Sequence, residues 1–228
     1  SATRIESEDG KNVKTYNYSY RYDEEGNQVE VNDGKTGTTT TYEYDVENQL
    51  IYVRIEKNGT KVSEEHNEYN GAGQRIKKID ITVTDSGKEE TKTTCYYYEG
   101  SLLLYTTNEN GVKTSQNIIG NQNNAFATIR YDGDKQSEYF YSKDVQGSVT
   151  NLIDNSETCS KSYNYTDFGE TEERFESEVD NEICYTGGVY DELTGLYYLN
   201  ARYYDSDDGN FLSQDTYRGG NLYGYCGG

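Results

Sequence analysis

The chain has 228 residues, enough for one large β domain or a solenoid segment with a sizeable core. Only 32% of the residues are hydrophobic, but 26 tyrosines supply the aromatic surface that disordered chains lack. The composition therefore excludes a disordered protein. With 21 basic and 41 acidic residues, the net charge of −20 repels a phosphate backbone and excludes direct binding of DNA or RNA. No apolar run approaches the roughly 18 residues of a membrane span, so no membrane insertion is expected.

Turn signals divide the chain into short units. The starts at 22, 44, 69 and 98 are separated by 22, 25 and 29 residues, a drifting period that is typical of hairpins with strands of variable length. The signals are Tyr22-Asp23-Glu24-Glu25-Gly26-Asn27, 44–50, 69–74, Tyr98-Glu99-Gly100, Tyr131-Asp132-Gly133 and 165–169.

Each unit combines alternating Tyr, Thr, Val and Ile with an Asp/Asn and Gly turn, as in strands predicted at 38–44 and 50–56. Asn58-Gly59 predicts a tight hairpin turn. The same turn is expected at Asp33-Gly34, Asn110-Gly111 and Asp132-Gly133.

The aspartates of these units need a physical role. We expect each carboxylate to accept backbone N–H groups of its turn, while the preceding tyrosine packs on the next hairpin. Helix signals are nearly absent, and the acidic segment 171–180 has too few apolar positions for an amphipathic helix.

The longest motif lies near the C-terminus. It runs YDELTGLYYLNARYYD from Tyr190 to Asp205 and continues through Gly209, Phe211, Asp215 and Gly219. This segment resembles the core signature of the RHS/YD-repeat family, with Ser206 at a position where that family usually has proline.

The resemblance implies an all-β fold of antiparallel hairpins forming a curved or spiralling sheet, part of a shell around a C-terminal toxin domain or of a cell-surface protein. Residues 1–135 are expected to form degenerate repeats and 136–228 the core signature region, with 190–219 turned inward as a plug. The chain begins at Ser1 without methionine and is expected to be a piece of a longer protein.

Family resemblance also implies a partial catalytic site. Shells of this family end in an aspartyl-type self-cleaving site, and Arg202 and Asp215 fall on its arginine and first aspartate. The second aspartate is expected beyond Gly228, and one carboxylate cannot both activate and protonate a peptide bond. No catalysis is therefore predicted, and a structural salt bridge is the favoured role for Arg202.

Other constellations carry no cofactor or metal prediction. His66 is the single histidine and is expected at the surface. Gly71-Ala72-Gly73 leads into a strand rather than the helix of a phosphate loop. The acidic run Asp205, Asp207 and Asp208 lacks EF-hand spacing and is read as an acidic turn rather than a calcium site.

Four cysteines are widely spaced and contain no CxxC pair, which argues against zinc: Cys95, Cys159, Cys184 and Cys226. Three disulfide pairings are open in an exported protein, and buried thiols are expected in a reducing compartment. The acidic, Tyr-rich composition favours a secreted or bacterial surface protein, in which disulfides can form.

The sequence thus predicts a non-enzymatic shell segment whose partners are the rest of the shell and its cargo. Open strand edges also allow homo-oligomers. The alternative is an adhesion module whose exposed tyrosines, at 16–20 or 139–141, stack on glycans. A self-cleaving enzyme is the third candidate.

Overall fold

The computed structural model describes residues 2–8, 12–121, 124–174, 177–215 and 222–224, with main chain only before residue 15. Its first fifteen strands form one antiparallel sheet in which every strand pairs with the next along the chain. The strands are β1 Ala2–Glu8, β2 Asn12–Tyr22, β3 Gln28–Asp33, β4 Thr38–Tyr44, β5 Leu50–Lys57, β6 Thr60–Tyr69, β7 Arg75–Val83, β8 Glu89–Glu99, β9 Leu102–Thr107, β10 Lys113–Ile119, β11 Ala125–Asp132, β12 Lys135–Lys143, β13 Val149–Asp154, β14 Cys159–Tyr165 and β15 Thr171–Glu173.

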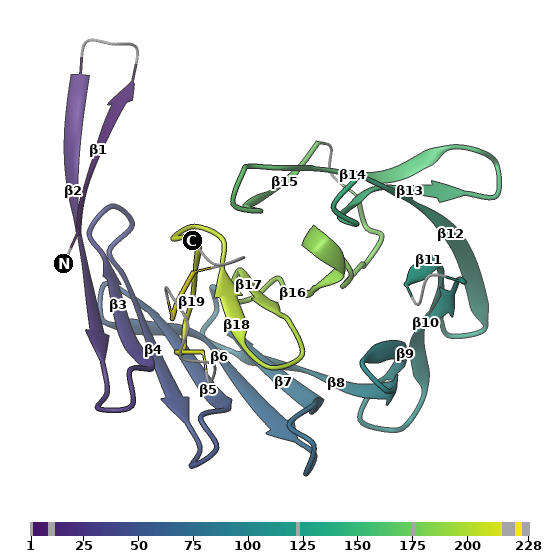
Figure 1. Cartoon of the computed structure of the whole chain (residues 1–228), viewed down its shortest axis with the longest axis horizontal. Helices are drawn as coiled ribbons and strands as arrows, with labels where there is room; N and C mark the ends of the chain where they lie inside the picture. Colours follow the sequence, from purple (N-terminus) through teal and green to yellow (C-terminus); the bar gives the residue numbers. More distant parts are fainter. Residues whose placement is uncertain (1, 9–11, 122–123, 175–176, 216–221, 225–228) are drawn as a thin grey trace.

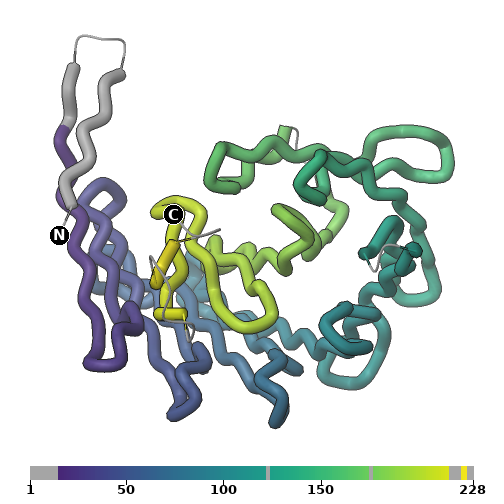
Figure 2. The backbone as a smooth tube through the Cα atoms, in the orientation of Figure 1, coloured from purple at the N-terminus to yellow at the C-terminus, as the bar shows by residue number. Residues whose placement is uncertain are grey.

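A second, four-stranded sheet follows, which we call the plug. It contains β16 Val189–Asp191, β17 Leu196–Tyr198, β18 Tyr203–Asp205 and β19 Asn210–Phe211, after a short 3-10 turn η1 at Tyr185–Gly187. The long sheet curls around the plug, which lies on its concave side (Figure 1). Figure 2 shows the chain returning, in yellow, into the space that its own earlier strands enclose. The expected curved all-β fold is confirmed.

The plug is buried on both faces because side chains alternate along its strands. Leu196, Tyr198 and Tyr203 pack with Leu50 and Val53 of the first half of the long sheet. On the other face, Tyr197, Tyr204 and Phe211 pack with Val149 and Leu152 of the second half. The signature therefore joins the two halves of the long sheet, which we also call the wall. Tyr197 and Tyr204 have no exposed surface.

The repeat aspartates act as the sequence predicted. Asp45 Oδ1 accepts the backbone N–H of Glu47 at 3.0 Å and of Gln49 at 2.9 Å. The same pair of bonds, between 2.8 and 3.0 Å, forms at four other turns, whose first residues are Asn70, Asn108, Asp144 and Asp154. The carboxylate-to-turn interpretation is confirmed at Asp45, Asp144 and Asp154 but not at Asp132, which instead pairs with Lys135 in the sheet. Asparagine serves equally at Asn70 and Asn108 because its side-chain oxygen is the acceptor.

The second part of the interpretation, that the tyrosine before each turn packs on the next hairpin, needs a correction. Tyr44 and Tyr69 donate their hydroxyls to the carbonyls of Gln28, at 2.9 Å, and Leu50, at 2.7 Å. Both carbonyls belong to the preceding unit, not the following one. The hydroxyl of each part-buried ring thus finds its hydrogen-bond partner in a main-chain carbonyl of an earlier strand.

The predicted turns are right at one position and wrong in detail at three. Asn58 and Gly59 both have positive φ, 51° and 75°, as the tight hairpin requires. At Asp33 the strands pair through Thr38 across a four-residue loop, and at Asp132 they pair through Lys135 around Gly133 and Asp134. At Asn110-Gly111 only the glycine has positive φ. In the longer loops that begin at Asp33 and Asn108, the carboxylate or amide at the loop start holds the backbone. The turn after Asp132 is a two-residue turn that lies one position later than predicted.

Replacing Asp45 with alanine should lower the free energy of unfolding by about 1–2 kcal/mol, because two turn N–H groups lose their acceptor. Chemical denaturation measures it. Asp45→Asn should change little, since asparagine occupies the same position at other turns. Glu43→Ala, on the exposed face of β4 next to this turn, is the matched control. Equal losses for Asp45→Ala and Glu43→Ala would contradict the role of the carboxylate.

Candidate functional site

A buried ion cluster fastens the plug to the long sheet. Arg75 opens β7 and Asp191 closes β16, and neither side chain is exposed. Arg75 Nη2 donates to Asp191 Oδ1 at 2.9 Å, and Nη1 donates to Oδ2. Lys78 Nζ lies 3.1 Å from the same Oδ1 and 3.1 Å from Asp80. One plug carboxylate is thus held by two cations of one strand of the wall.

Aromatic rings enclose the guanidinium. The Arg75 Cζ atom lies 4.7 Å from the ring centroids of both Tyr96 and Tyr198 and 5.6 Å from that of Tyr203. Arg75 Nη1 also donates to the Tyr203 hydroxyl at 3.0 Å. Since cation–π contacts strengthen away from water, these rings from the wall and the plug stabilise the buried charge.

Glu65 on β6 is the member of this cluster whose charge is least well compensated. It is fully buried, Asn67 donates to its Oε1 at 2.8 Å, and its Oε2 has no hydrogen-bond partner among the described residues. Burial and the nearby Asp191 charge raise the pKa of Glu65 to about 7, although Lys78 and Arg75 oppose the shift. Burial also tends to raise the pKa of Asp191, but Arg75 and Lys78 outweigh it and hold that pKa below its ordinary value.

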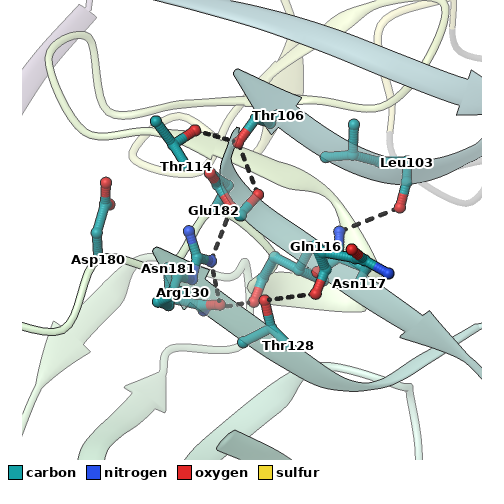
Figure 3. Close-up of polar contacts among 12 residues, drawn as sticks. Leu103, Thr106, Thr114, Gln116, Asn117, Thr128, Arg130, Asp180, Asn181 and Glu182 are labelled. Atoms are coloured by element: carbon teal, nitrogen blue, oxygen red, sulfur yellow. Dashed lines mark hydrogen bonds and ion pairs between the residues drawn. The ribbon is translucent and has the colours of Figure 1, made fainter. Parts of the chain in front are cut away.

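A second fastening lies between the long sheet and residues 177–183, which we call the strap. Arg130 Nη2 on β11 donates to Glu182 at 2.8 Å and to Asn181 Oδ1 at 3.3 Å, as Figure 3 shows. The Tyr141 hydroxyl donates to the same Asn181 oxygen at 2.9 Å. The strap leads directly into the plug, so these contacts fix the entrance to it.

The inner face of the sheet beside the strap is polar. The Thr106 hydroxyl lies 2.7 Å from that of Thr114 and 2.6 Å from that of Ser115, and Asn117 Nδ2 donates to the Leu103 carbonyl at 3.1 Å (Figure 3). Thr106 and Ser115 are fully buried. Thr114 of this face lines a cavity of about 1420 Å³. Strands of the long sheet, the strap and the start of the plug line the rest of the cavity.

Arg202 and Asp215 form an ion pair. Arg202 Nη2 donates to Asp215 Oδ2 at 2.7 Å, and the Arg202 Cζ atom lies 3.7 Å from the Phe211 ring centroid. The Asp215 N–H donates to the Leu222 carbonyl at 2.9 Å. The pair therefore ties the chain after β19 to the plug.

The acidic turn packs against β2. Asp207 N–H donates to Asp205 Oδ1 at 3.0 Å, and the Tyr20 hydroxyl donates to Asp208 at 2.9 Å. Burial, followed by the charges of Asp208 and Asp207, raises the pKa of Asp205 to about 7. Within the described ranges, no group of three or more His, Cys, Asp or Glu side chains is placed to hold a metal ion.

The remaining candidates take ordinary positions. His66 is half-buried, with its ring centroid 4.9 Å from that of Tyr52, so the expected surface placement holds only in part. Gly71-Ala72-Gly73 lies in the turn before β7. Cys95, Cys159 and Cys184 are free thiols, and Cys226 lies outside the described residues.

Tyrosine orientation bears on the adhesion alternative. Among tyrosines with described side chains, only Tyr22 and Tyr97 are exposed, at 48% and 40%. Tyr18, in the middle of the alternating run at 16–20, is buried. The other described tyrosines are buried or half-buried, which leaves little fully exposed ring surface for stacking on glycans.

The sequence did not single out Arg75, Lys78 or Glu65. One signal was present: Arg75 directly follows a repeat turn, at the position where Leu50 and Val149 supply inward apolar side chains. A charge at such a position needs a buried partner. Asp191 was noticed only as part of the motif, and its partners come from a strand more than 100 residues earlier.

A meander of hairpins that curls around its own tyrosine-rich end defines the class of YD-repeat shells. Residues 103–223, more than half of the chain, match the family model described as Teneurin YD-shell, and residues 22–61 match RHS Repeat. The chain belongs to this YD-shell family, and the resemblance inferred from the motif is confirmed. No helix in the described part of the chain is long and apolar enough to cross a membrane.

Curated relatives are much longer than this chain. It is 32% identical over 232 residues to the tRNA nuclease WapA of Bacillus subtilis, covering 86% of this chain and 9% of that protein. It is 25% identical over 231 residues to the double-stranded DNA deaminase toxin A of Burkholderia cenocepacia, covering 91% and 16%. The aligned region is thus a minor part of each relative.

Solved structures show the same fold. The chain resembles a chain of the TcdB2-TccC3-Cdc42 crystal structure with a TM-score of 0.65 and 20% identity, covering 96% of this chain and 13% of that one. A chain of the Photorhabdus luminescens Tc holotoxin pore gives a TM-score of 0.64 and 19% identity, covering 94% and 13%.

Neutralising Asp191 should release the plug. Asp191→Asn leaves the fully buried Arg75 without its carboxylate and Lys78 with only Asp80 and Glu65, and should cost about 3–5 kcal/mol of unfolding free energy. Asp180→Asn breaks the exposed Lys92–Asp180 pair and should cost less than about 1 kcal/mol. Denaturation curves with hydrogen exchange of β16–β18 measure both, and similar losses in the two variants would contradict the anchoring role.

The buried Glu65 carboxyl and the half-buried Asp205 carboxyl should lower the stability of the fold as pH rises. Because folding raises the pKa values of Glu65 and Asp205 to about 7, the unfolded carboxyls ionise before the folded ones, and the free energy of unfolding falls as pH rises from about 4 to 7. Glu65→Gln and Asp205→Asn should therefore gain stability relative to the parent over this window. Parallel denaturation of parent and variants measures the difference, and a difference independent of pH would refute the assignment.

Proposed function

We propose that this chain is a wall-and-plug section of a longer YD-repeat shell, and that its role is structural: to enclose or present another polypeptide. The observation that carries the proposal is the plug, which is buried on both faces and fastened to the wall by fully buried charges. Such an arrangement would close one side of an enclosure. The cargo we propose is a C-terminal toxin domain, and the compartment is secretory or the bacterial cell surface.

The long sheet supports continuation into a larger shell. β1 and β15 are its outermost strands, so each has one main-chain edge unpaired within the described part of the chain. Such edges accept further strands. The relatives and solved structures are between about six and eleven times longer than the aligned part, which is consistent with more shell on either side.

Arg202 and Asp215 fit this structural role. Their ion pair is half-exposed, and the stacking of Arg202 on Phe211 holds the chain after β19 against the plug. We propose that the pair secures this exit segment. A self-cleaving centre built on it would need a further carboxylate to divide acid and base roles.

Protease protection tests the proposed function. In the full-length protein that contains this section, the enclosed polypeptide should resist cleavage under conditions that digest the same polypeptide expressed alone. Asp191→Asn should expose it to cleavage several-fold faster, because the plug loses its anchor. Asp180→Asn should leave protection unchanged.

Two results would overturn the proposal. One is an unprotected polypeptide in the parent shell. The other is full protection in an Asp191→Asn shell whose plug is shown by hydrogen exchange to be released.

A further inference from the structure

The cavity beside the strap has the size and polarity of a polymer site. Its volume of about 1420 Å³ exceeds the roughly 300–1,000 Å³ of typical small-molecule pockets, which are also mostly apolar. Threonines, tyrosines and charged side chains form most of this lining, including Thr82, Thr93 and Tyr139. The cavity therefore suits a hydrated chain with polar side chains.

The cations of the lining are already neutralised, with one exception. Arg130 pairs with Glu182 at 2.8 Å, Lys161 with Glu173 at 2.7 Å and Lys92 with Asp180 at 3.2 Å. Lys78 is shared between Asp191 and Asp80. Lys135 is the lining cation that forms no ion pair with any described residue.

The anions of the lining exceed these partners. Four lining carboxylates form no ion pair with described residues, and they belong to four different segments: Glu109, Asp132, Glu178 and Glu192. Together they leave the cavity with a surplus of negative charge after every ion pair is counted. Acidic walls of a concave site concentrate the field and attract cations.

We propose that this cavity binds a lysine- or arginine-rich segment of polypeptide, and this proposal rests on the shell function above. The surplus carboxylates supply the ionic contacts. Tyr131 and Tyr139 of the lining can receive guanidinium or ammonium groups over their rings. Nucleic acid is repelled by the same surplus, and an acidic segment would add like charges to it.

A basic polypeptide ligand agrees with the charge of the substrates for which two relatives are named. Proteins named as a tRNA nuclease and a DNA deaminase act on polyanions, and surfaces that bind polyanions are basic. A negatively lined wall is complementary to the basic surface of such a cargo.

Fluorescence anisotropy with labelled peptides tests the proposal on the 228-residue chain. A ten-residue lysine–arginine peptide should bind, with an affinity that falls as salt increases, whereas glutamate-rich and Gly-Ser peptides of equal length should not. The triple variant Glu109→Gln, Asp132→Asn, Glu192→Gln should weaken binding about tenfold or more by removing lining charges.

The control is a triple variant with the same charge change outside the cavity. Glu24→Gln, Glu43→Gln and Glu99→Gln alter exposed carboxylates that do not line it, and binding should stay within about twofold. Matching thermal unfolding midpoints would show that both variants remain folded.

Three outcomes would overturn the proposal: no binding of the basic peptide, equal binding of the acidic one, or equal loss of binding in both triple variants. The last would assign the attraction to the overall charge of −20 rather than to the cavity. If the enclosed polypeptide is protected in the full-length shell but the basic peptide shows no preference for the cavity, the shell function stands and only the charge preference fails.

Discussion

A guanidinium with no exposed surface must find an anion inside the protein, and the Arg75–Asp191 pair is the constraint on which this architecture depends. Arg75 belongs to the wall and Asp191 to the plug, so the charge of each is compensated only when the plug is seated. A hydrophobic contact tolerates sliding, whereas a two-pronged ion pair fixes position and orientation. Tyr96, Tyr198 and Tyr203 close around the pair and exclude the water that would otherwise compete for it.

Tyrosine explains how so polar a chain builds a core. Each ring buries apolar area, and each hydroxyl needs a partner that the interior must provide. Here the partners are backbone carbonyls at strand ends: Tyr44, Tyr69 and Tyr165 each bond a carbonyl of an earlier unit. Successive units are thereby linked through hydroxyls as well as through the sheet ladder, and the inward surface stays polar enough to border a large cavity.

The same polarity joins structure to function. In the proposed role, a wall whose inner cations other than Lys135 are paired and whose surplus carboxylates line a cavity would confine a polypeptide without offering it a hydrophobic surface on which to collapse. Fastening at the plug and at the strap keeps that wall closed on one side. The proposed shell role and the proposed preference for basic segments both follow from how these charges are distributed.

The sequence by itself determined the local structure. Period-two alternation and Asx turns such as that at Asp45 depend on residues close together in the chain, so the hairpins could be predicted from them. The curved shell and the inward turn of the signature were predicted from the resemblance of the motif around 190–205 to a known family. The pairing of Arg202 with Asp215 also joins near neighbours and came with the motif. Only the tertiary structure decided which tyrosines face inward, which earlier carbonyl each hydroxyl meets, and that Arg75, Lys78 and Glu65 surround Asp191. The tyrosine bonds join neighbouring repeat units, whereas the contacts with Asp191 join residues more than 100 positions apart, and a repeat pattern does not specify the curvature of the sheet that brings them together.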